Sequence, residues 1–294
     1  MSKLEQALGP IYAVLAYGAW GLFPLYWKQF GTIPPWEIIS HRMIWSLVLL
    51  VGLLGLGKRW GAFCQALVDW RRSGLLLLSA LLLAANWGLY IFGVNSDRVV
   101  ETSLGYFINP LVTVLLGAIF YQERFRRAQV VAIALAATGV GLFVVQFGQV
   151  PWIALGVAFS FAFYGLLRKG IAIAPLVGLA IETLLLAPLA LIYVGQLQVS
   201  GAGNFLSSPS LTLLFIGSGI ATALPLLWFN NAAKRLRLST LGLFQYLAPS
   251  LQLLIGVWVY GEPFTRAHGI TFGLIWTALL IYGISARIQS AQPS

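Results

Sequence analysis

The chain has 294 residues, of which 59% are hydrophobic and only 9% are charged, and its mean hydropathy is +0.86. A soluble domain of this size does not need so apolar a composition, which therefore indicates an integral membrane protein. The formal net charge of +10 would also suit a nucleic-acid-binding protein, unless the basic residues gather on one side of a membrane.

Ten apolar runs follow one another along the chain, each long enough to cross about 30 Å of hydrocarbon as a helix. The period-2 alternation of membrane β-strands is absent. The sequence therefore predicts an all-α integral membrane protein with ten transmembrane helices at residues 9–27, 36–57, 73–95, 99–121, 128–147, 150–167, 175–197, 210–231, 239–260 and 267–286. Residues 58–72 carry Trp60 and Trp70 among basic residues, which predicts a short interfacial helix. Residues 196–209 are expected to form the longest outer loop.

The basic residues are unevenly distributed over this topology. If the N-terminus is cytoplasmic, Lys28, Arg98 and Arg266 fall outside, Arg42 falls within a span, and the other 14 of the 18 Lys and Arg residues fall on the cytoplasmic side. This is the positive-inside pattern, and it explains the net charge without nucleic acid. We expect both termini to be cytoplasmic and the basic side chains to contact membrane lipids.

The second half of the chain repeats the first at an offset of 139 residues. Within residues 110–128, eight of 19 positions recur: Pro110, Leu115, Gly117, Tyr121, Glu123, Phe125, Arg127 and Ala128 match Pro249, Leu254, Gly256, Tyr260, Glu262, Phe264, Arg266 and Ala267. Because five spans are an odd number, the second copy enters the membrane in the opposite orientation. The sequence thus predicts two inverted five-helix repeats, residues 1–147 and 150–294, an arrangement typical of secondary transporters.

Each repeat carries the same three residues at the same spacing: Pro110, Gly117 and Glu123, then Pro249, Gly256 and Glu262. The proline removes a helical hydrogen bond, and the glycine lets another helix approach closely. The glutamate falls before the following span, whose N-terminal amides its carboxylate can satisfy. Two interpretations stay open: a hinge beside a substrate cavity, or a packing kink followed by a helix-end carboxylate.

Two short segments, Tyr17–Gly21 and Ser40–Ser46, together with the five-plus-five pattern, resemble the EamA family of the drug/metabolite transporter (DMT) superfamily. They resemble its RarD group still more closely, a group that carries the label chloramphenicol-sensitive protein. The resemblance covers essentially the whole chain. It implies a permease of bacterial inner membranes that exports or exchanges small metabolites, but it does not supply the natural substrate.

Polar groups within the spans are candidates for function, because burying them in a membrane is costly. Of the eight acidic residues only Glu182 lies well inside a span, and at an offset of 141 residues it corresponds to His41, beside Arg42. We expect Glu182 to couple protons or bind a substrate amine, and Arg42 to hold a substrate carboxylate. Alternatively, Glu182 bonds a neighbouring helix, Arg42 reaches the headgroups and His41 is a satisfied interior residue. Inversion of the repeats makes a direct pair between Glu182 and Arg42 unexpected.

Aromatic and amide side chains provide further candidates. In the resembled family, the helices that carry them surround a central cavity, which implies contact with an amphipathic solute. The alternative is ordinary packing or an interfacial belt. These candidates are Trp20, Asn86, Trp87, Tyr106, Asn109, Tyr164, Trp228, Gln245 and Tyr246.

Other classes of protein find little support in the sequence. Residues 52–58 match the GxxxxGK spacing of a P-loop, but Arg59 replaces the required Ser or Thr. Two histidines and one cysteine, with no HExxH motif, do not suggest an enzyme, a metal site or a cofactor. No predicted span carries the ring of charge of a channel. A channel or a non-transporting membrane scaffold stays open as the alternative.

We therefore predict a secondary transporter that moves small organic metabolites or drugs outward by alternating access. Without an ATP site, uphill transport must run on proton or solute gradients, and facilitated diffusion is the other possibility. The GxxxG motif at residues 269–273 permits close helix packing within the chain or in a homodimer. The protein is accordingly expected to be a monomer or a homodimer.

Overall fold

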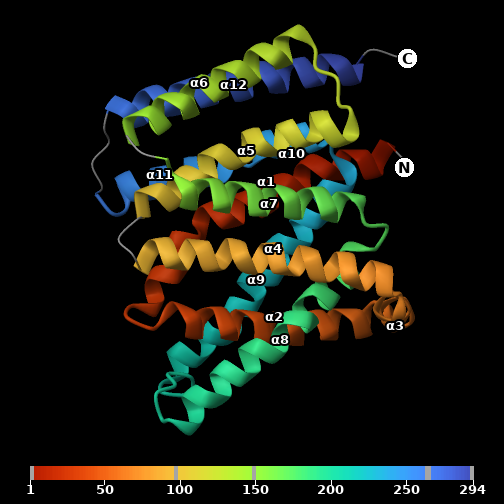
Figure 1. The fold of residues 1–294 in the computed structure, drawn as a ribbon, viewed down its shortest axis with the longest axis vertical. Coiled ribbons are helices and arrows are strands. Elements are labelled where there is room, and N and C mark those ends of the chain that lie inside the picture. The colour runs from red at the N-terminus through yellow and green to blue at the C-terminus, as the bar shows by residue number, and fades with distance from the viewer. Residues whose placement is uncertain (1–2, 96–98, 148–149, 262–265, 292–294) are drawn as a thin grey trace. The chain divides into compact units, whose positions relative to one another are not determined.

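The computed structural model describes residues 3–95, 99–147, 150–261 and 266–291, which are mainly helical and contain no strand (Figure 1). In chain order the helices are α1 (Lys3–Trp27), η1 (Lys28–Phe30), α2 (Pro35–Leu56), α3 (Trp60–Val68), α4 (Trp70–Asn95), α5 (Val99–Tyr121), α6 (Arg127–Phe147), α7 (Trp152–Gly170), α8 (Pro175–Val199), α9 (Pro209–Arg235), α10 (Leu238–Phe244), α11 (Leu247–Trp258) and α12 (Arg266–Ala291).

Within the described residues, eight helical stretches are long and apolar enough to cross a membrane: Leu8–Phe30, Pro35–Leu56, Trp70–Tyr90, Leu104–Tyr121, Trp152–Gly170, Pro175–Val199, Pro209–Arg235 and Leu238–Tyr260. Two shorter apolar stretches are Arg127–Leu142 and Gly269–Ser285. These helices lie where the apolar runs predicted them, which confirms an all-α multi-pass membrane protein. That all ten cross the bilayer, and that both termini are cytoplasmic, stay predictions.

Two connections show where local chemistry sets the helix ends. The helix expected within 58–72 is α3, but α3 ends at Val68, and Trp70 is the first residue of α4. The loop expected to begin at residue 196 begins later, because α8 continues to Val199. Beyond that residue the Ser200 amide still bonds the Gln196 carbonyl, and Gly201 turns the chain with a φ of +67°. A glycine is favoured at such a left-handed helix end because it has no Cβ.

The chain divides into two compact units, and each takes helices from both halves of the sequence. The first unit contains α1 to α3, α4 as far as Ala84, and Leu167–Arg235; in it α9 packs on α1 and α2, and α8 packs on α2 and α3. The second contains Ala85–Leu166 and the chain from Leu236; in it α12 packs on α6, and α10 packs on α5. Each predicted repeat therefore contributes helices to both compact units. The inverted relation of the repeats stays a prediction.

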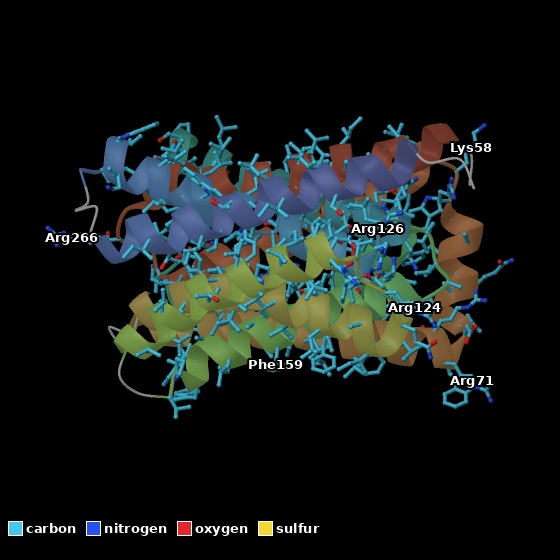
Figure 2. The ribbon with its side chains drawn as sticks, turned by 90° about the horizontal axis from the view of Figure 1, so that it is seen from above. Lys58, Arg71, Arg124, Arg126, Phe159 and Arg266 are labelled. Carbon is cyan, nitrogen blue, oxygen red and sulfur yellow. The ribbon has the colours of Figure 1, made fainter. Side chains whose placement is uncertain are left out.

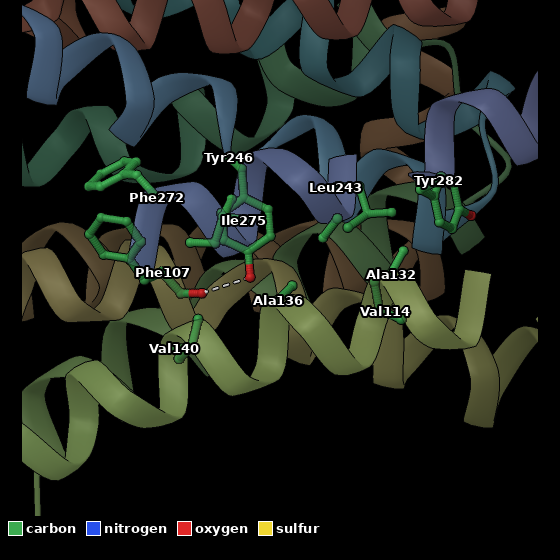
Figure 3. Packing of buried hydrophobic residues seen from close by; sticks show 11 residues of the cluster. Phe107, Val114, Ala132, Ala136, Val140, Leu243, Tyr246, Phe272, Ile275 and Tyr282 are labelled. Atoms are coloured by element: carbon green, nitrogen blue, oxygen red, sulfur yellow. Dashed lines mark hydrogen bonds between the residues drawn. The ribbon is translucent and has the colours of Figure 1, made fainter. Parts of the chain in front are cut away.

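The core of the second unit depends on small residues that let helices approach closely. Ala132, Ala136 and Val140 lie four residues apart on one face of α6, and α12 packs against this face (Figure 3). A Cβ on Gly139 would lie 3.2 Å from the Thr271 carbonyl oxygen. Lipid tails are as apolar as leucine, so close van der Waals packing of this kind, instead of hydrophobic burial, holds membrane helices together. By contrast, a Cβ on Gly273 would meet no atom of a neighbouring described residue within 4 Å, so this glycine of the GxxxG motif does not serve close packing among the described helices.

The two repeated prolines have different effects on their helices. Pro249 has no N–H to donate to the Gln245 carbonyl, and the helix is interrupted there, between α10 and α11. At the interruption the amides of Gln245 and Tyr246 bond carbonyls three residues back, as in a 3₁₀ turn. Helix α5, in contrast, runs through Pro110 from Val99 to Tyr121 without interruption. A helix interruption therefore accompanies only the second proline.

The basic residues mark the ends of helices in each unit. In the second unit Arg124 and Arg126 lie at one end and Arg266 lies at the opposite end (Figure 2). In the first unit Lys58 and Arg71 both lie at the end that carries α3 (Figure 2). Each of these placements agrees with the distribution of charge from which the topology was predicted.

Candidate functional site

Arg42 is held inside the first unit, where α2 crosses α9. Its Nε donates a hydrogen bond to Thr222 Oγ1 at 2.8 Å, and its guanidinium carbon lies 4.5 Å from the centre of the Trp27 ring. The helices cross closely because Gly219 has no side chain: a Cβ there would lie 2.7 Å from the Ser46 amide nitrogen. A cation over an aromatic ring is stabilised by the ring quadrupole. This guanidinium is therefore positioned within a candidate span.

His41 lies beside Arg42 but in aromatic surroundings. Its ring stacks on Phe205 at a centroid distance of 4.7 Å and lies 4.4 Å from the Phe215 ring. The side chain is only 3% exposed, and neither ring nitrogen has a hydrogen-bond partner among the described residues. The histidine is thus an interior residue, and no described residue bonds its ring nitrogens.

Glu182 pairs with Arg168, near the end of α7. Its Oε1 lies 3.6 Å from Arg168 Nε and accepts a hydrogen bond from the Ser79 hydroxyl of α4. The charge pattern predicts Arg168 to be a cytoplasmic basic residue at a helix end, yet its side chain is fully buried. Nothing local distinguishes Arg168 from the adjacent Lys169, so only the packing of α8 and α9 against the end of α7 reveals the pair.

Further contacts lock the Arg168 guanidinium in place. Its Nε donates to Asn230 Oδ1 at 3.1 Å, and its Nη2 donates to the Pro175 carbonyl at 3.3 Å. Gly178 of α8 makes room for it, since a Cβ there would lie 2.8 Å from Nη2 and closer still to Nη1. A buried ion pair whose partners also make hydrogen bonds is costly to break, because breaking it leaves an uncompensated charge.

The remaining candidates are distributed over both units. Trp20 and Trp228, with His41, Arg42 and Glu182, belong to the first unit, and the other seven belong to the second: Asn86, Trp87, Tyr106, Asn109, Tyr164, Gln245 and Tyr246. In the first unit the Trp20 ring lies 5.4 Å from Tyr17 and 5.8 Å from Phe229.

In the second unit the amide candidates join helices to one another. Asn86 donates to the Val157 carbonyl at 2.8 Å, and Asn109 donates to the Ala158 carbonyl at 2.6 Å. Gln245, at the break between α10 and α11, donates to Thr113 Oγ1 at 3.1 Å. Tyr246 donates to the Phe107 carbonyl at 3.3 Å (Figure 3). These contacts hold the helices in register.

The aromatic candidates of the second unit differ in exposure. Tyr164 is fully buried beside Phe161, whereas Tyr106 is exposed and its ring lies 6.2 Å from that of Tyr90. Trp87 is half-buried. Tyr106 and Trp87 are thus the more accessible aromatic candidates of this unit.

The repeated glutamate satisfies the start of a different helix from the one that its position in the sequence predicts. Glu123 was expected to satisfy the amides at the start of the next helix, α6. Instead its carboxylate accepts from the amides of Leu238 at 2.6 Å and Ser239 at 3.0 Å, at the start of α10. Gly117 leaves space for it, because a Cβ there would lie 3.1 Å from Glu123 Oε2. The second copy, Glu262, lies outside the described residues.

The described residues contain no group of three or more His, Cys, Asp or Glu side chains that would hold a metal ion. The features that stand out are thus charged side chains inside candidate spans, Arg42, Arg168 and Glu182 among them, within an all-α membrane fold. This combination defines a polytopic membrane protein with polar groups within its spans.

Comparison with known proteins gives the class. Residues 7–145 match the model of the EamA-like transporter family. An uncharacterized transporter of Vibrio cholerae is 47% identical over 94% of this chain and 92% of its own length. The protein RarD of Escherichia coli is 46% identical over 97% of both chains. The chain therefore belongs to the EamA-like transporter family, and its similarity to RarD proteins extends over nearly its whole length.

Two more distant similarities complete the comparison. A chloramphenicol-sensitive protein RarD of Pseudomonas aeruginosa is 30% identical over 87% of both chains. A solved crystal structure covers 95% of this chain and 98% of its own with a TM-score of 0.72 and 20% identity. At that identity the likeness shows the fold alone. The family membership confirms a transporter of the membrane, and not an enzyme.

Proposed function

We propose that the protein is a secondary transporter of the bacterial inner membrane, which moves small organic metabolites or drugs outward by alternating access. Family membership supports transport, and the predicted inverted repeats suit alternation of access between the two sides. The observation that carries the proposal is Arg42, a guanidinium held within a candidate span by Thr222 and Trp27. A planar, permanently charged group fixed in this way suits a solute with a carboxylate.

Glu182 is the proposed site of proton coupling. Its carboxylate is buried and close to Arg168, so protonating it would weaken the ion pair and free Arg168 to rearrange. The ion pair would be intact when Glu182 is charged and weakened when Glu182 is protonated. These are the two states that proton coupling requires.

The test separates binding from coupling. In proteoliposomes, Arg42→Lys should raise the KM for a carboxylate-bearing solute about tenfold or more, because lysine loses the planar fork. Glu182→Gln should abolish accumulation driven by a pH gradient while counterflow of the same solute persists. Glu123→Gln, which also alters a buried carboxylate, is the control and should leave coupling intact. Unchanged pH-driven accumulation in Glu182→Gln would refute the coupling role, and an unchanged KM in Arg42→Lys would refute the carboxylate site.

A further inference from the structure

The loop between α8 and α9, residues 200–208, reaches across to α2, and we call it the 200–208 strap. Its first residues stay on the end of α8, where the amides of Ala202 and Gly203 bond the Leu197 carbonyl at 3.0 and 3.2 Å. Its tip leaves α8 and contacts α2 through Asn204 and Phe205. The strap is therefore anchored at its base, and its tip is held by contacts with α2 and by the Phe205 ring, which lies 6.0 Å from the Phe215 ring of α9.

A buried carboxylate of α2 holds the tip. Glu37, only 1% exposed, accepts from the Asn204 amide at 2.6 Å and from Asn204 Nδ2 at 2.8 Å. Hydrogen bonds to a charged acceptor are about twice as strong as neutral ones. These two bonds form a latch that fixes the strap on α2.

Beyond the latch, Phe205 covers two polar rings of α2. It stacks on His41 and lies 5.9 Å from the Trp45 ring. Neither the His41 nitrogens nor Trp45 Nε1 has a hydrogen-bond partner among the described residues, although these atoms are buried. Leaving such buried groups unpaired is unfavourable, so water or a solute that reached them would gain hydrogen bonds. The closed strap thus hides unsatisfied groups.

The backbone of the strap also favours release. Leu206 follows Phe205 with a φ of +69°, a left-handed conformation that leucine rarely adopts, and its side chain is 71% exposed. The Ser207 amide bonds the Asn204 carbonyl at 3.2 Å, so Leu206 occupies the third position of a tight turn, where a positive φ favours glycine. Contacts of the tip with α2 maintain this strained turn, and losing them relieves it.

From these observations we propose that the 200–208 strap is a gate over α2, latched by Glu37 and Asn204. Its opening exposes His41 and Trp45, one turn apart on α2, to a solute that carries a hydrogen-bond acceptor such as a carboxylate. This gate deepens the proposed transport function and rests on it. Arg42, next to His41 in the chain, supplies the opposite charge for the same kind of solute.

Chemical modification of His41 by diethylpyrocarbonate reports the gate without requiring transport. The full chain in lipid nanodiscs is treated, and mass spectrometry reads His41 separately from His268, the other histidine in the sequence. When opening is fast, the modification rate follows the open population. Asn204→Ala removes one charge-assisted bond and should raise the His41 rate about tenfold or more. Phe205→Ala should raise it as well, whereas Ser207→Ala, in the same strap, should not.

A cross-link that holds the strap on α2 provides a second, independent test. A Glu37→Cys and Asn204→Cys pair, in a background with Cys64→Ser, is joined by a short bis-methanethiosulfonate cross-linker. Cross-linking should suppress His41 modification and stop solute exchange, and a reducing agent should restore both. The gate is overturned if His41 reacts equally in the wild type and in Asn204→Ala, or if the cross-linked protein exchanges solute at the wild-type rate. A protein that transports nothing while Asn204→Ala still unmasks His41 would instead count against the transport function.

Discussion

Substituting Gly178 by alanine probes the buried Arg168–Glu182 pair most sharply. The new methyl group would lie 2.8 Å from Arg168 Nη2, 2.9 Å from Cζ and closer still to Nη1, distances that real Cβ atoms do not show. The guanidinium is fully buried and bonded to Asn230 and Pro175, so it cannot move aside without giving up these contacts and Glu182.

The magnitude follows from one stabilising and two destabilising contributions. Alanine in place of a helical glycine stabilises by about 1 kcal/mol. Overpacking costs about 1–3 kcal/mol, and displacing one partner of a buried ion pair costs about 3–5 kcal/mol. Partial displacement therefore predicts a net loss of about 3 kcal/mol in the free energy of unfolding, measured by denaturation with sodium dodecyl sulfate in mixed micelles.

The chain offers a matched control on another helix. A Cβ on Gly273 would meet no atom within 4 Å in the part of the chain that the structure describes, and the residue is exposed. Gly273→Ala should therefore be neutral or stabilise the protein by up to about 1 kcal/mol. If Gly178→Ala proves as stable as Gly273→Ala, the guanidinium of Arg168 is not locked against α8 and the reasoning is refuted.

Three further predictions follow from the fold. Glu123→Ala should lower the free energy of unfolding by about 1–2 kcal/mol, because two amides at the start of α10 lose their acceptor; an unchanged value in the same denaturation assay would contradict this. Pro249→Ala should slow solute counterflow more than Pro110→Ala, since a helix break accompanies only Pro249; equal rates would argue against a hinge at the break. In a cysteine-free background, Lys58→Cys and Gln198→Cys should react with impermeant maleimides from opposite sides of the membrane. Labelling of both from the same side would contradict the predicted topology.

The positions of the helices could be predicted because a membrane span needs about 20 apolar residues, and such runs are visible in the sequence. The end of α8 was missed because hydropathy does not detect that residues such as Gln196 still continue the helical hydrogen bonds as far as Ser200. The repeat was also visible, but its glutamate was assigned by proximity in sequence. Glu123 caps α10, more than 100 residues away, a pairing that only the packing of α10 on α5 creates.

The candidate site was predictable only in part, because hydropathy locates a polar residue in a span without revealing its partners. Glu182 and Arg42 were visible as charges inside apolar runs. Arg168 was not, because an arginine at the end of a helix has the same local pattern whether it faces headgroups or turns inward. The roles of Asn86, Asn109 and Gln245 depended likewise on the carbonyl or hydroxyl that each amide reaches in a neighbouring helix.

The central claim is that the chain moves small organic solutes across the membrane by using gradients, without ATP. The most direct measurement is uptake by proteoliposomes of a panel of amino acids, nucleosides and amphipathic drugs, read by mass spectrometry with and without an imposed pH gradient. We predict that one class accumulates above the level in protein-free vesicles, that its members carry a carboxylate, and that the pH gradient increases the accumulation. Folded protein that moves no member of the panel under either condition would contradict the claim and favour a membrane scaffold.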